Sequence, residues 1–366
     1  MRKGINMDIT TEIKKFRRIG VLTSGGDAPG MNAAVRSVVR SALANGVEVM
    51  GIIGGYRGLI EDDMKLLGPH DVSNIINEGG TFLFTDRCDE FKQPEYVKKG
   101  VEIARRAGID GLVCIGGDGT FRGALDLTRN GLPCIGITGT IDNDVSSSDY
   151  TVGFDTAKNT VLEMVDRLRD TCESHARCNV VEVMGRDAGF IAVETAIATG
   201  ATGCAVIERE FDENALIEKI KRGKTFNKRN FIVIVSEGMG AEFSEGLAKK
   251  IQAETGVETK FARLAHVQRG GRPTLIDRVT ASRMGAHAVE LLLAGKSNLI
   301  VTENDGVIGS RDIEWALMFD KVYKRKAKPE QIAALDPAVY EDMKRLAEIK
   351  RARFNALYDL ANSISI

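Results

Sequence analysis

Residues 133–144 read Pro133-Cys134-Ile135-Gly136-Ile137-Thr138-Gly139-Thr140-Ile141-Asp142-Asn143-Asp144, an apolar run that leads into a polar turn. The apolar part predicts a short buried strand, so the polar part should lie at the carboxyl end of that strand. In open parallel sheets, ligands bind in the crevice outside the carboxyl ends of the strands. Asp, Asn and Thr also suit a plain turn, because their side chains hydrogen-bond to nearby backbone groups. The stretch by itself is therefore compatible with a ligand-binding turn and with a purely structural one.

The same succession of strand, glycine-rich turn and helix occurs earlier in the chain. Residues 19–23 form an apolar run that enters Ser24-Gly25-Gly26-Asp27, and a helix is expected over 33–44. Residues 111–115 enter Gly116-Gly117-Asp118-Gly119-Thr120 in the same way, before a helix expected over 121–128. Strands that alternate with helices through short turns predict βαβ units and a parallel sheet. The runs are nearly continuous, as is typical of strands buried on both faces.

The pattern starts again after Asp149. Further strands are expected over 179–183, 204–207 and 231–235, with helices over 156–170, 188–198, 214–221, 244–254 and 278–294. A charged amphipathic helix is expected over 337–360. The predicted fold is α/β, with two Rossmann-like three-layer αβα domains, largely parallel sheets and a cleft between them. The predicted first domain comprises 18–152 and about 267–317, the second 153–266 and about 318–336, and a helical tail covers 337–366.

Composition narrows the classes of function. With 43% hydrophobic and 28% charged residues, the chain can build a sizeable core, and its net charge of −1 favours neither nucleic acid nor a membrane as partner. The six cysteines include no C-x-x-C pair, which predicts reduced thiols and a cytoplasmic location, and the four histidines lack the spacing of a zinc site. The polar start, Met1 to Arg17, lacks the apolar core of a signal peptide. No apolar run reaches the ~20 residues that a membrane helix needs.

Both early glycine-rich turns could bind phosphate. Glycines between a strand and a helix let backbone amides approach phosphate oxygens, and the helix N-terminus adds partial positive charge. No lysine follows either turn as in the Walker motif, and no G-x-G-x-x-G opens the first helix. Asp118, between glycines at a strand end, suits Mg²⁺, which usually binds one or two carboxylates plus substrate phosphates. Asp118 would also serve as a helix N-cap, and the two roles are compatible.

Five motifs in order carry a resemblance to a known family. They are Ser-Gly-Gly-Asp-Ala-Pro-Gly-Met-Asn from 24, Gly-Gly-Asp-Gly-Thr from 116, Gly-Thr-Ile-Asp-Asn-Asp from 139, Met-Gly-Arg from 184 and His-Val-Gln-Arg-Gly-Gly from 266. Together they resemble the bacterial-type 6-phosphofructokinase family, over about residues 18–309. Gly-Gly-Asp-Gly-Thr also occurs in NAD kinases and lipid kinases, so that motif alone decides little.

The resemblance implies transfer of a phosphoryl group from ATP to fructose 6-phosphate, with Mg²⁺ on Asp118 as cofactor. Asp142 would be the general base for the C1 hydroxyl, with Thr140 and Asp144 beside it; Arg87 and Arg186 would neutralise charge on the moving group. The first domain would bind the nucleotide, through Gly26, Arg87, Cys88, Gly117, Asp118, Gly119 and Thr120. The second would bind the sugar phosphate, through Thr140, Asp142, Arg177, Met184, Gly185, Arg186, Glu237, Lys260, His266 and Arg269.

The phosphoryl donor is argued from size and charge. In the pyrophosphate-dependent branch of the family, the positions of Gly119 and Gly139 typically carry Asp and Lys. An Asp side chain would fill the space of the nucleotide's α-phosphate and repel it, whereas glycine leaves that space open. The two glycines therefore favour ATP, with pyrophosphate as the alternative donor. A sensor of nucleotide or sugar phosphate is the non-enzymatic alternative, and tagatose 6-phosphate is an alternative acceptor.

The sequence also departs from the family pattern. Lys260 stands where bacterial members usually have Arg, which keeps the charge but loses the bidentate fork, and Asp155 differs from the commonest ATP-branch residue. In the bacterial effector site, the matching residues are Arg36, Arg40, Arg169 and Lys228, while Pro69, Asn74, Thr202 and Phe226 replace its usual Arg, Asp, Glu and Lys. We therefore expect altered effector control. Family members are usually homotetramers in which groups such as Arg177 and Lys260 come from a neighbouring subunit.

Overall fold

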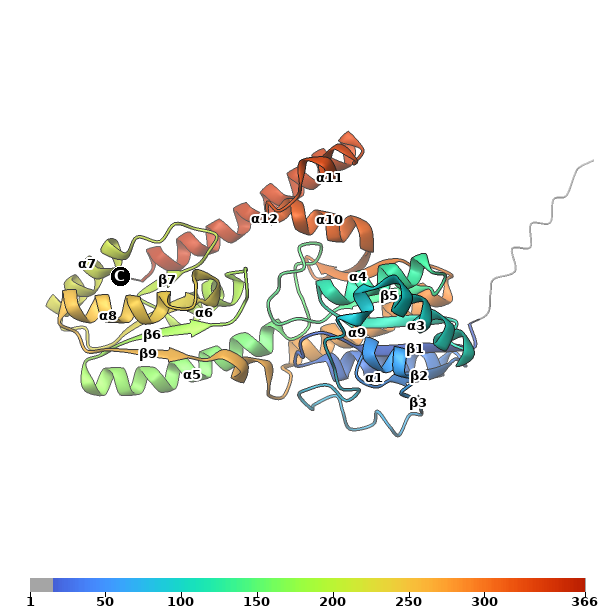
Figure 1. Cartoon of the computed structure of the whole chain (residues 1–366). Coiled ribbons are helices and arrows are strands. Elements are labelled where there is room, and N and C mark those ends of the chain that lie inside the picture. Colours follow the sequence, from blue (N-terminus) through green and yellow to red (C-terminus); the bar gives the residue numbers. More distant parts are fainter. Residues whose placement is uncertain (1–15, 366) are drawn as a thin grey trace, which may run out of the picture.

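The protein contains two β-sheets, each covered by helices, in a computed structural model that describes residues 16–365 (Figure 1). The expectation about the polar start therefore concerns residues that mostly lie outside the described part. The first sheet has seven strands in the order β11-β10-β5-β4-β1-β2-β3, and the second has four in the order β7-β8-β6-β9. The expected α/β fold with two largely parallel sheets is confirmed.

The first sheet is parallel except at its two edges. β1, β2, β4, β5 and β10 run parallel, whereas β3 pairs antiparallel with β2, and β11 with β10. Its strands are β1 (Arg18–Thr23), β2 (Glu48–Ile52), β3 (Met64–Leu67), β4 (Gly111–Gly116), β5 (Cys134–Thr138), β10 (Leu299–Asn304) and β11 (Val307–Asp312). The sequence analysis did not predict β3, β10 or β11. It therefore did not foresee the antiparallel pair at either edge of this sheet.

Alternation along the strands of the first sheet builds a core on each face. Val113 and Ile115 of β4 pack into a cluster with α1 (Met31–Ala44) and α9 (Leu275–Leu293). Leu112 and Cys114 point to the other face, where they join a cluster with the remaining helices. Those helices are α2 (Tyr56–Glu61), α3 (Pro94–Arg106), α4 (Asp118–Arg129) and α10 (Ile313–Tyr323). Successive strand side chains point to opposite faces, so this sheet is the middle of three layers.

The second sheet is entirely parallel and is also covered on both faces. Its strands are β6 (Cys178–Val183), β7 (Gly203–Ala205), β8 (Phe231–Ser236) and β9 (Thr259–Arg263). One face packs on α7 (Glu213–Thr225) and α8 (Phe243–Thr255), and the other on α5 (Phe154–His175) and α6 (Phe190–Thr199). β7 is shorter than the strand expected over 204–207, because the chain turns at Val206–Arg209.

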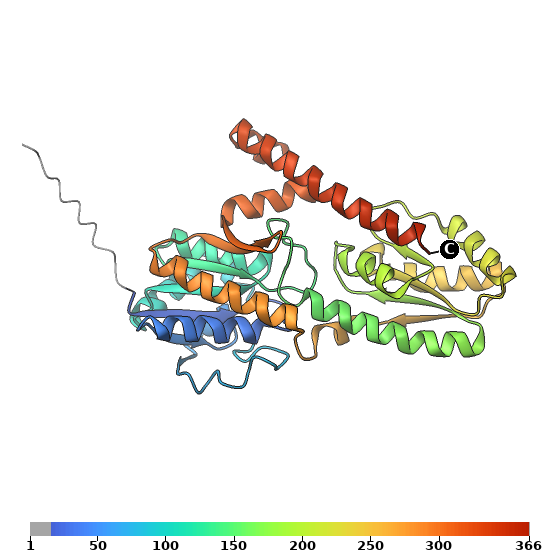
Figure 2. The same ribbon diagram turned by 180° about the vertical axis from the view of Figure 1, so that it is seen from behind.

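The C-terminal helices connect the two sheets. α12 (Pro337–Ser363) follows the short α11 (Pro329–Ala333) and runs from α10, beside the first sheet, to α6 and β7 in the second (Figure 2). Phe319 of α10 packs against Met343 and Ala347 of α12, and Trp315 stacks on Phe319 with ring centroids 4.9 Å apart. Further along, Phe354 and Tyr358 join the core of the second sheet. The expected tail helix is confirmed, whereas α2, α10 and α11 were not foreseen.

A second connection joins β5 to α5 and is held by one buried carboxylate. Asp277, in the first turn of α9, accepts hydrogen bonds from the Tyr150 hydroxyl (2.5 Å), the Gly153 amide (2.7 Å) and the Thr156 amide (2.8 Å). Gly153 has φ +104°, and a Cβ there would lie 2.6 Å from Ala28 Cβ, so glycine is required. The start of α5 is thereby fixed to the first sheet. The predicted residue limits of the two domains stay a prediction.

Candidate active site

Three polar turns meet at one edge of the first sheet. They follow β1, β4 and β5, which are neighbours in the sheet and parallel, so their carboxyl ends share that edge. Thr120 Oγ1 donates to the Ser24 carbonyl at 3.0 Å, and a Cβ on Gly117 would lie 3.9 Å from Thr140 Cβ. A Cβ on Gly116 would lie 2.4 Å from the Ser24 carbonyl oxygen, so only glycine permits this approach. The edge brings the turns at 24–27, 116–120 and 139–144 together.

Asp142 is a buried carboxylate beside an arginine. It is 1% exposed, its Oδ2 lies 3.2 Å from Arg186 Nε, and its Oδ1 has no hydrogen-bond partner among the described residues. Burial, followed by the charge of Asp144, raises the pKa of Asp142 to about 6, although Arg186 and Arg269 oppose the shift. A carboxylate with a pKa near neutrality is a capable proton acceptor.

Arg186 reaches Asp142 from the second sheet. It follows β6 in a left-handed turn with φ 51°. Glu237, after β8, fixes this turn because its Oε1 accepts hydrogen bonds from the amides of Gly185 (3.1 Å) and Arg186 (2.8 Å). The buried Gln268 accepts from the Met184 amide at 2.9 Å. The carboxyl end of the second sheet thus faces that of the first.

Arg269 and the loop before α3 complete the first sheet's edge. Arg269 Nη1 donates to the Asp27 carbonyl at 3.2 Å, and a Cβ on Gly26 would lie 2.7 Å from the same nitrogen. Thr85 Oγ1 donates to the Gly25 carbonyl at 2.8 Å, which holds the segment with the exposed Arg87 and half-buried Cys88 beside this turn. The five sequence motifs therefore converge, although Asp27 and Arg269 are 242 positions apart in the chain.

The residues around Asp118 fit a magnesium ion. Asp118 begins α4, its side chain is 38% exposed, and its ion partner is Arg122, at 2.7 Å on the same helix. A Cβ on the neighbouring Gly119 would meet no atom within 4 Å, so open space lies beside this carboxylate. No cluster of three metal-binding side chains occurs within residues 16–365. One carboxylate facing open space suits Mg²⁺ that is shared with ligand phosphates. Gly139 differs from Gly119, since a Cβ there would lie 2.9 Å from Met31 Cε.

Two residues expected at the substrate lie far from Asp142. Arg177 precedes β6, whereas Arg186 follows it, so the two stand at opposite ends of one strand. Arg177 and Lys260 both pair with Glu258, at 2.7 Å and 2.9 Å. His266 is exposed on a 3₁₀ turn, Ala265–Arg269. The six residues of β6 span roughly 20 Å at ~3.3 Å per residue, so a single sugar phosphate beside Arg186 would not reach Arg177 of the same chain.

The expected effector residues form two groups. Arg36 and Arg40 lie on α1, where burial and the neighbouring Arg40 lower the pKa of Arg36. Arg169 lies on α5 and donates to Asn230 Oδ1 at 2.9 Å, while burial and Arg169 lower the pKa of Lys228. Among the replaced positions, Thr202 is buried and Phe226 is 79% exposed. The first group thus lies on a helix of the first sheet, and the second lies on α5 and the segment before β8, beside the second sheet.

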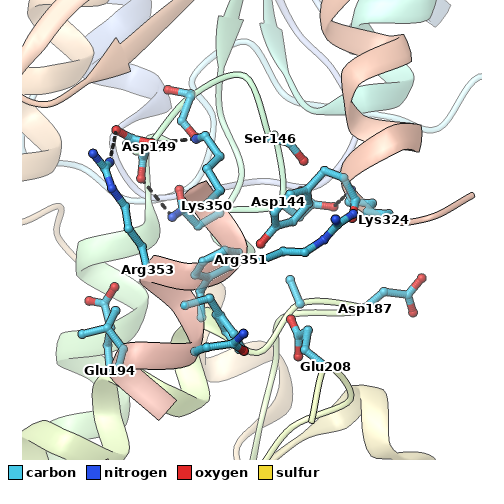
Figure 3. Close-up of a pocket in the computed structure, with 18 of the residues that line it drawn as sticks. Asp144, Ser146, Asp149, Asp187, Glu194, Glu208, Lys324, Lys350, Arg351 and Arg353 are labelled. Atoms are coloured by element: carbon cyan, nitrogen blue, oxygen red, sulfur yellow. Dashed lines mark hydrogen bonds and ion pairs between the residues drawn. The ribbon is translucent and has the colours of Figure 1, made fainter. Parts of the chain in front are cut away.

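A cavity of about 1040 Å³ lies between the sheets, behind the turn that carries Asp142 (Figure 3). Asn143 and Asp144 contribute to its wall, together with Glu208 from the second sheet and Lys324 and Arg351 from the C-terminal helices. Lys324 pairs with Asp144 at 3.2 Å and with Asp320 at 3.0 Å. The sequence analysis did not single out Lys324, because no motif links it to a residue 180 positions earlier.

Comparisons with known proteins agree with this geometry. The sequence model of the family described as phosphofructokinase matches residues 18–292. Curated relatives from Bacillus cereus and Bacillus thuringiensis, named ATP-dependent 6-phosphofructokinase, are each 50% identical over 302 residues, which cover 82% of this chain and 94% of theirs.

Two solved structures show how far the likeness extends. The structure of phosphofructokinase from Saccharomyces cerevisiae is 32% identical with a TM-score of 0.79 and covers 89% of this chain, which spans 50% of the yeast chain. A pyrophosphate-dependent phosphofructokinase from Marinobacter aquaeolei has a TM-score of 0.72 and covers 81% of this chain and 83% of its own, but at 24% identity it shows the fold alone. By its family match, its close relatives and its two-sheet fold, this chain belongs to the phosphofructokinase family.

Proposed function

We propose that the protein is an ATP-dependent 6-phosphofructokinase, which converts fructose 6-phosphate to fructose 1,6-bisphosphate in glycolysis. The observation that carries the proposal is Asp142, a 1%-exposed carboxylate with a raised pKa, whose turn meets the two glycine-rich turns at 24–27 and 116–120. The names of relatives at 50% identity and the open space at Gly119 support ATP as the donor. The first domain would hold the nucleotide and the second the sugar phosphate.

The proposed mechanism relies on position and charge. Asp142 takes the proton of the sugar's O1 hydroxyl as that oxygen attacks the γ-phosphorus of ATP, the bond from this phosphorus to the β–γ bridging oxygen breaks, and ADP leaves. Its pKa of about 6 leaves Asp142 ionised at neutral pH. Backbone amides of the 116–120 turn and the guanidiniums of Arg87 and Arg186 stabilise negative charge on the phosphoryl oxygens. Asp118 would hold Mg²⁺, which when bound supplies further positive charge to the phosphate oxygens. Thr140 and Asp144 would position the acceptor hydroxyl and the base.

Both oxygens of Glu237 have a use in this arrangement. Oε1 accepts from the amides of Gly185 and Arg186, which leaves Oε2 for a sugar hydroxyl. His266 and Arg269 would bind the 6-phosphate, because an arginine fork matches phosphate oxygens.

All six cysteines are free, and five of them are buried, which supports a reducing compartment such as the cytoplasm. Within the described residues, no helix is long and apolar enough to cross a bilayer.

The test of the function is an activity matrix of donors and acceptors. ATP and pyrophosphate are each combined with fructose 6-phosphate and tagatose 6-phosphate, and product formation is followed by a coupled assay. Turnover should be greatest with ATP and fructose 6-phosphate. Faster turnover with pyrophosphate would transfer the protein to the other branch, and saturable binding without turnover in every combination would favour a sensor.

We also propose a homotetramer in which each site borrows Arg177 and Lys260 from a neighbour. The opposite placement of Arg177 and Arg186 on β6 supports this, as does an exposed apolar face on α9: Leu275 is 76% exposed, and Ile276 and Val279 are each 49% exposed. Large exposed apolar groups on one helix face are typical of an interface.

Shared sites predict complementation between two inactive variants. Arg177→Ala and Asp142→Asn proteins should each be nearly inactive, but co-expressed mixtures should recover about a quarter of wild-type activity. A quarter is expected because a working site needs Asp142 from one variant and Arg177 from the other. Mass measurement in solution gives the number of subunits. If mixtures never exceed the sum of the two parents, the site is contained within one chain.

A further inference from the structure

The turn that carries Asp142 is held from behind by the C-terminal helices. Lys324, directly after α10, lies beside Asp144 (Figure 3), with Nζ 3.2 Å from Asp144 Oδ2. The same nitrogen lies 3.0 Å from Asp320 Oδ2. The other oxygen of Asp320 accepts the Ser146 amide at 2.6 Å. The segment 144–146 is therefore bound to α10 by two interactions: the ion pair of Lys324 with Asp144 and the hydrogen bond from the Ser146 amide to Asp320.

The residues that follow this segment, Ser148 and Asp149, are bound by side chains of α12. Lys350 Nζ donates to the Ser148 carbonyl (3.1 Å) and pairs with Asp149 Oδ1 (2.6 Å). Arg353 Nη1 lies 3.4 Å from Asp149 Oδ2. Neither α10 nor α12 lies in the part of the chain matched by the family model, which ends at residue 292. The catalytic turn is thus fixed by residues outside the family's motifs.

We propose that Lys324 is a positioning residue for the reaction: it holds Asp144 and balances its charge, and so sets the protonation of Asp142. This inference rests on the proposed function, in which Asp142 is the base. Lys324 does not itself touch the substrate, so its effect should appear in the pH dependence of the reaction.

Electrostatics give the direction of that effect. The charged groups that act on Asp142 are Asp144 and Glu237, which raise its pKa, and Arg186 and Arg269, which lower it. Lys324 is 21% exposed, and the nearby Asp144 and Asp320 raise its pKa despite burial, so it stays charged at neutral pH. Removing this positive charge leaves the repulsion between Asp144 and Asp142 uncompensated. The ionised form of Asp142 is disfavoured, and its pKa rises.

Lys324→Gln is the informative variant, because the amide keeps a donor but not the charge. The midpoint of the acid limb of the kcat/KM profile should shift to higher pH by roughly half a unit, as expected for one charge several ångströms away in a protein. Lys324→Arg should restore the wild-type limb. Asp144→Asn should shift the limb to lower pH, and Asp144→Asn with Lys324→Gln should lie close to the wild-type limb, because this double variant removes one charge of each sign beside Asp142. Lys344→Gln, which removes a lysine paired with Glu341 within α12, is the matched control.

A second readout does not need activity. The difference in Tm between each protein and its Asp142→Asn counterpart, measured by calorimetry against pH, reports the pKa of Asp142 through linkage. In the Lys324→Gln background, the midpoint of that difference should lie above that of wild type. An active wild type with unchanged limb and midpoint in Lys324→Gln would overturn the role of Lys324 and leave the proposed function intact. An inactive wild type would overturn the proposed function, and the Tm midpoint would still decide whether Lys324 sets the protonation of Asp142.

Discussion

Replacing Asp142 by Asn is expected to lower kcat by about 10²–10⁴-fold, the range for loss of a general base. The asparagine amide has the same shape, so the site should keep its geometry and its affinity for ATP. Arg186 loses its partner, but its side chain is 55% exposed and can be solvated. The measurement is steady-state kinetics together with ATP binding by calorimetry.

The pH dependence belongs to the same prediction. Because the pKa of Asp142 is about 6 in the folded protein, wild-type kcat/KM should fall on the acid side with a midpoint near pH 6. Asp142→Asn should abolish that limb in its residual activity. Turnover close to that of wild type in Asp142→Asn would remove Asp142 from the role of base.

Burial of the ionised Asp142 should also lower the free energy of unfolding of the wild-type protein at neutral pH. The folded pKa of Asp142 lies above the ordinary value of 3.8, so the stabilising protonated state is present at low pH and is lost as the pH rises through about 6. At pH 7 the penalty is on the order of 3 kcal/mol, since two pKa units at 1.36 kcal/mol each are involved. Asp142→Asn should therefore be more stable than wild type at pH 7, with little difference at pH 4. Asp187→Asn, at an exposed carboxylate whose pKa is lowered by Lys326, should show no such gain.

Gly119→Asp is the second change with a large expected effect. Gly119 is exposed in the first turn of α4, and a Cβ there meets no atom within 4 Å, so the variant should fold normally. Its carboxylate would occupy the space beside Asp118 where we place the nucleotide's phosphates. Like charges about 4 Å apart repel by ~1–4 kcal/mol at effective dielectric constants of 80 to 20. The value of kcat/KM for ATP should fall by about 5- to 1000-fold.

The control is Gly119→Asn, which has nearly the same volume and no charge. It should keep most of the activity with ATP, because its amide can donate to phosphate oxygens. Pyrophosphate is smaller than ATP and has no α-phosphate for the new carboxylate to repel. Gly119→Asp should therefore lower any activity with pyrophosphate less than it lowers the activity with ATP. Equal kcat/KM for ATP in the Asp and Asn variants would show that the polyphosphate does not lie beside this turn.

Local signals in the sequence predicted most of the fold. Continuous apolar runs that end in glycine turns identified most of the buried parallel strands, because such strands need apolar side chains on both faces. The edge strands β3 and β11 of the first sheet were missed, since β3 has only four residues and β11 has no buried residue. The parallel strands β9 and β10 were missed as well. Asp305-Gly306, with φ 50° and 81°, joins β10 to β11, and this dipeptide is a recognised hairpin signal that would have located the pair.

The sequence predicted those parts of the candidate site that lie in recognisable motifs. The turns around Asp118 and Asp142 follow adjacent strands, so sheet topology alone brings them together. The pair of Lys324 with Asp144 has no such origin, because it depends on where α10 packs against the first sheet. The placement of Arg177 away from Arg186 follows from the six residues of β6 between them, and only the resemblance assigned both to one substrate.

The stacking of Trp315 on Phe319 has a practical consequence. Trp315 is the single tryptophan of the chain, and it packs where α10 meets α4 and α12. Intrinsic fluorescence excited at the indole band will therefore report on this junction and not on the second sheet. An emission change that precedes the loss of far-ultraviolet ellipticity would reveal that the bridge between the two halves loosens before either sheet melts.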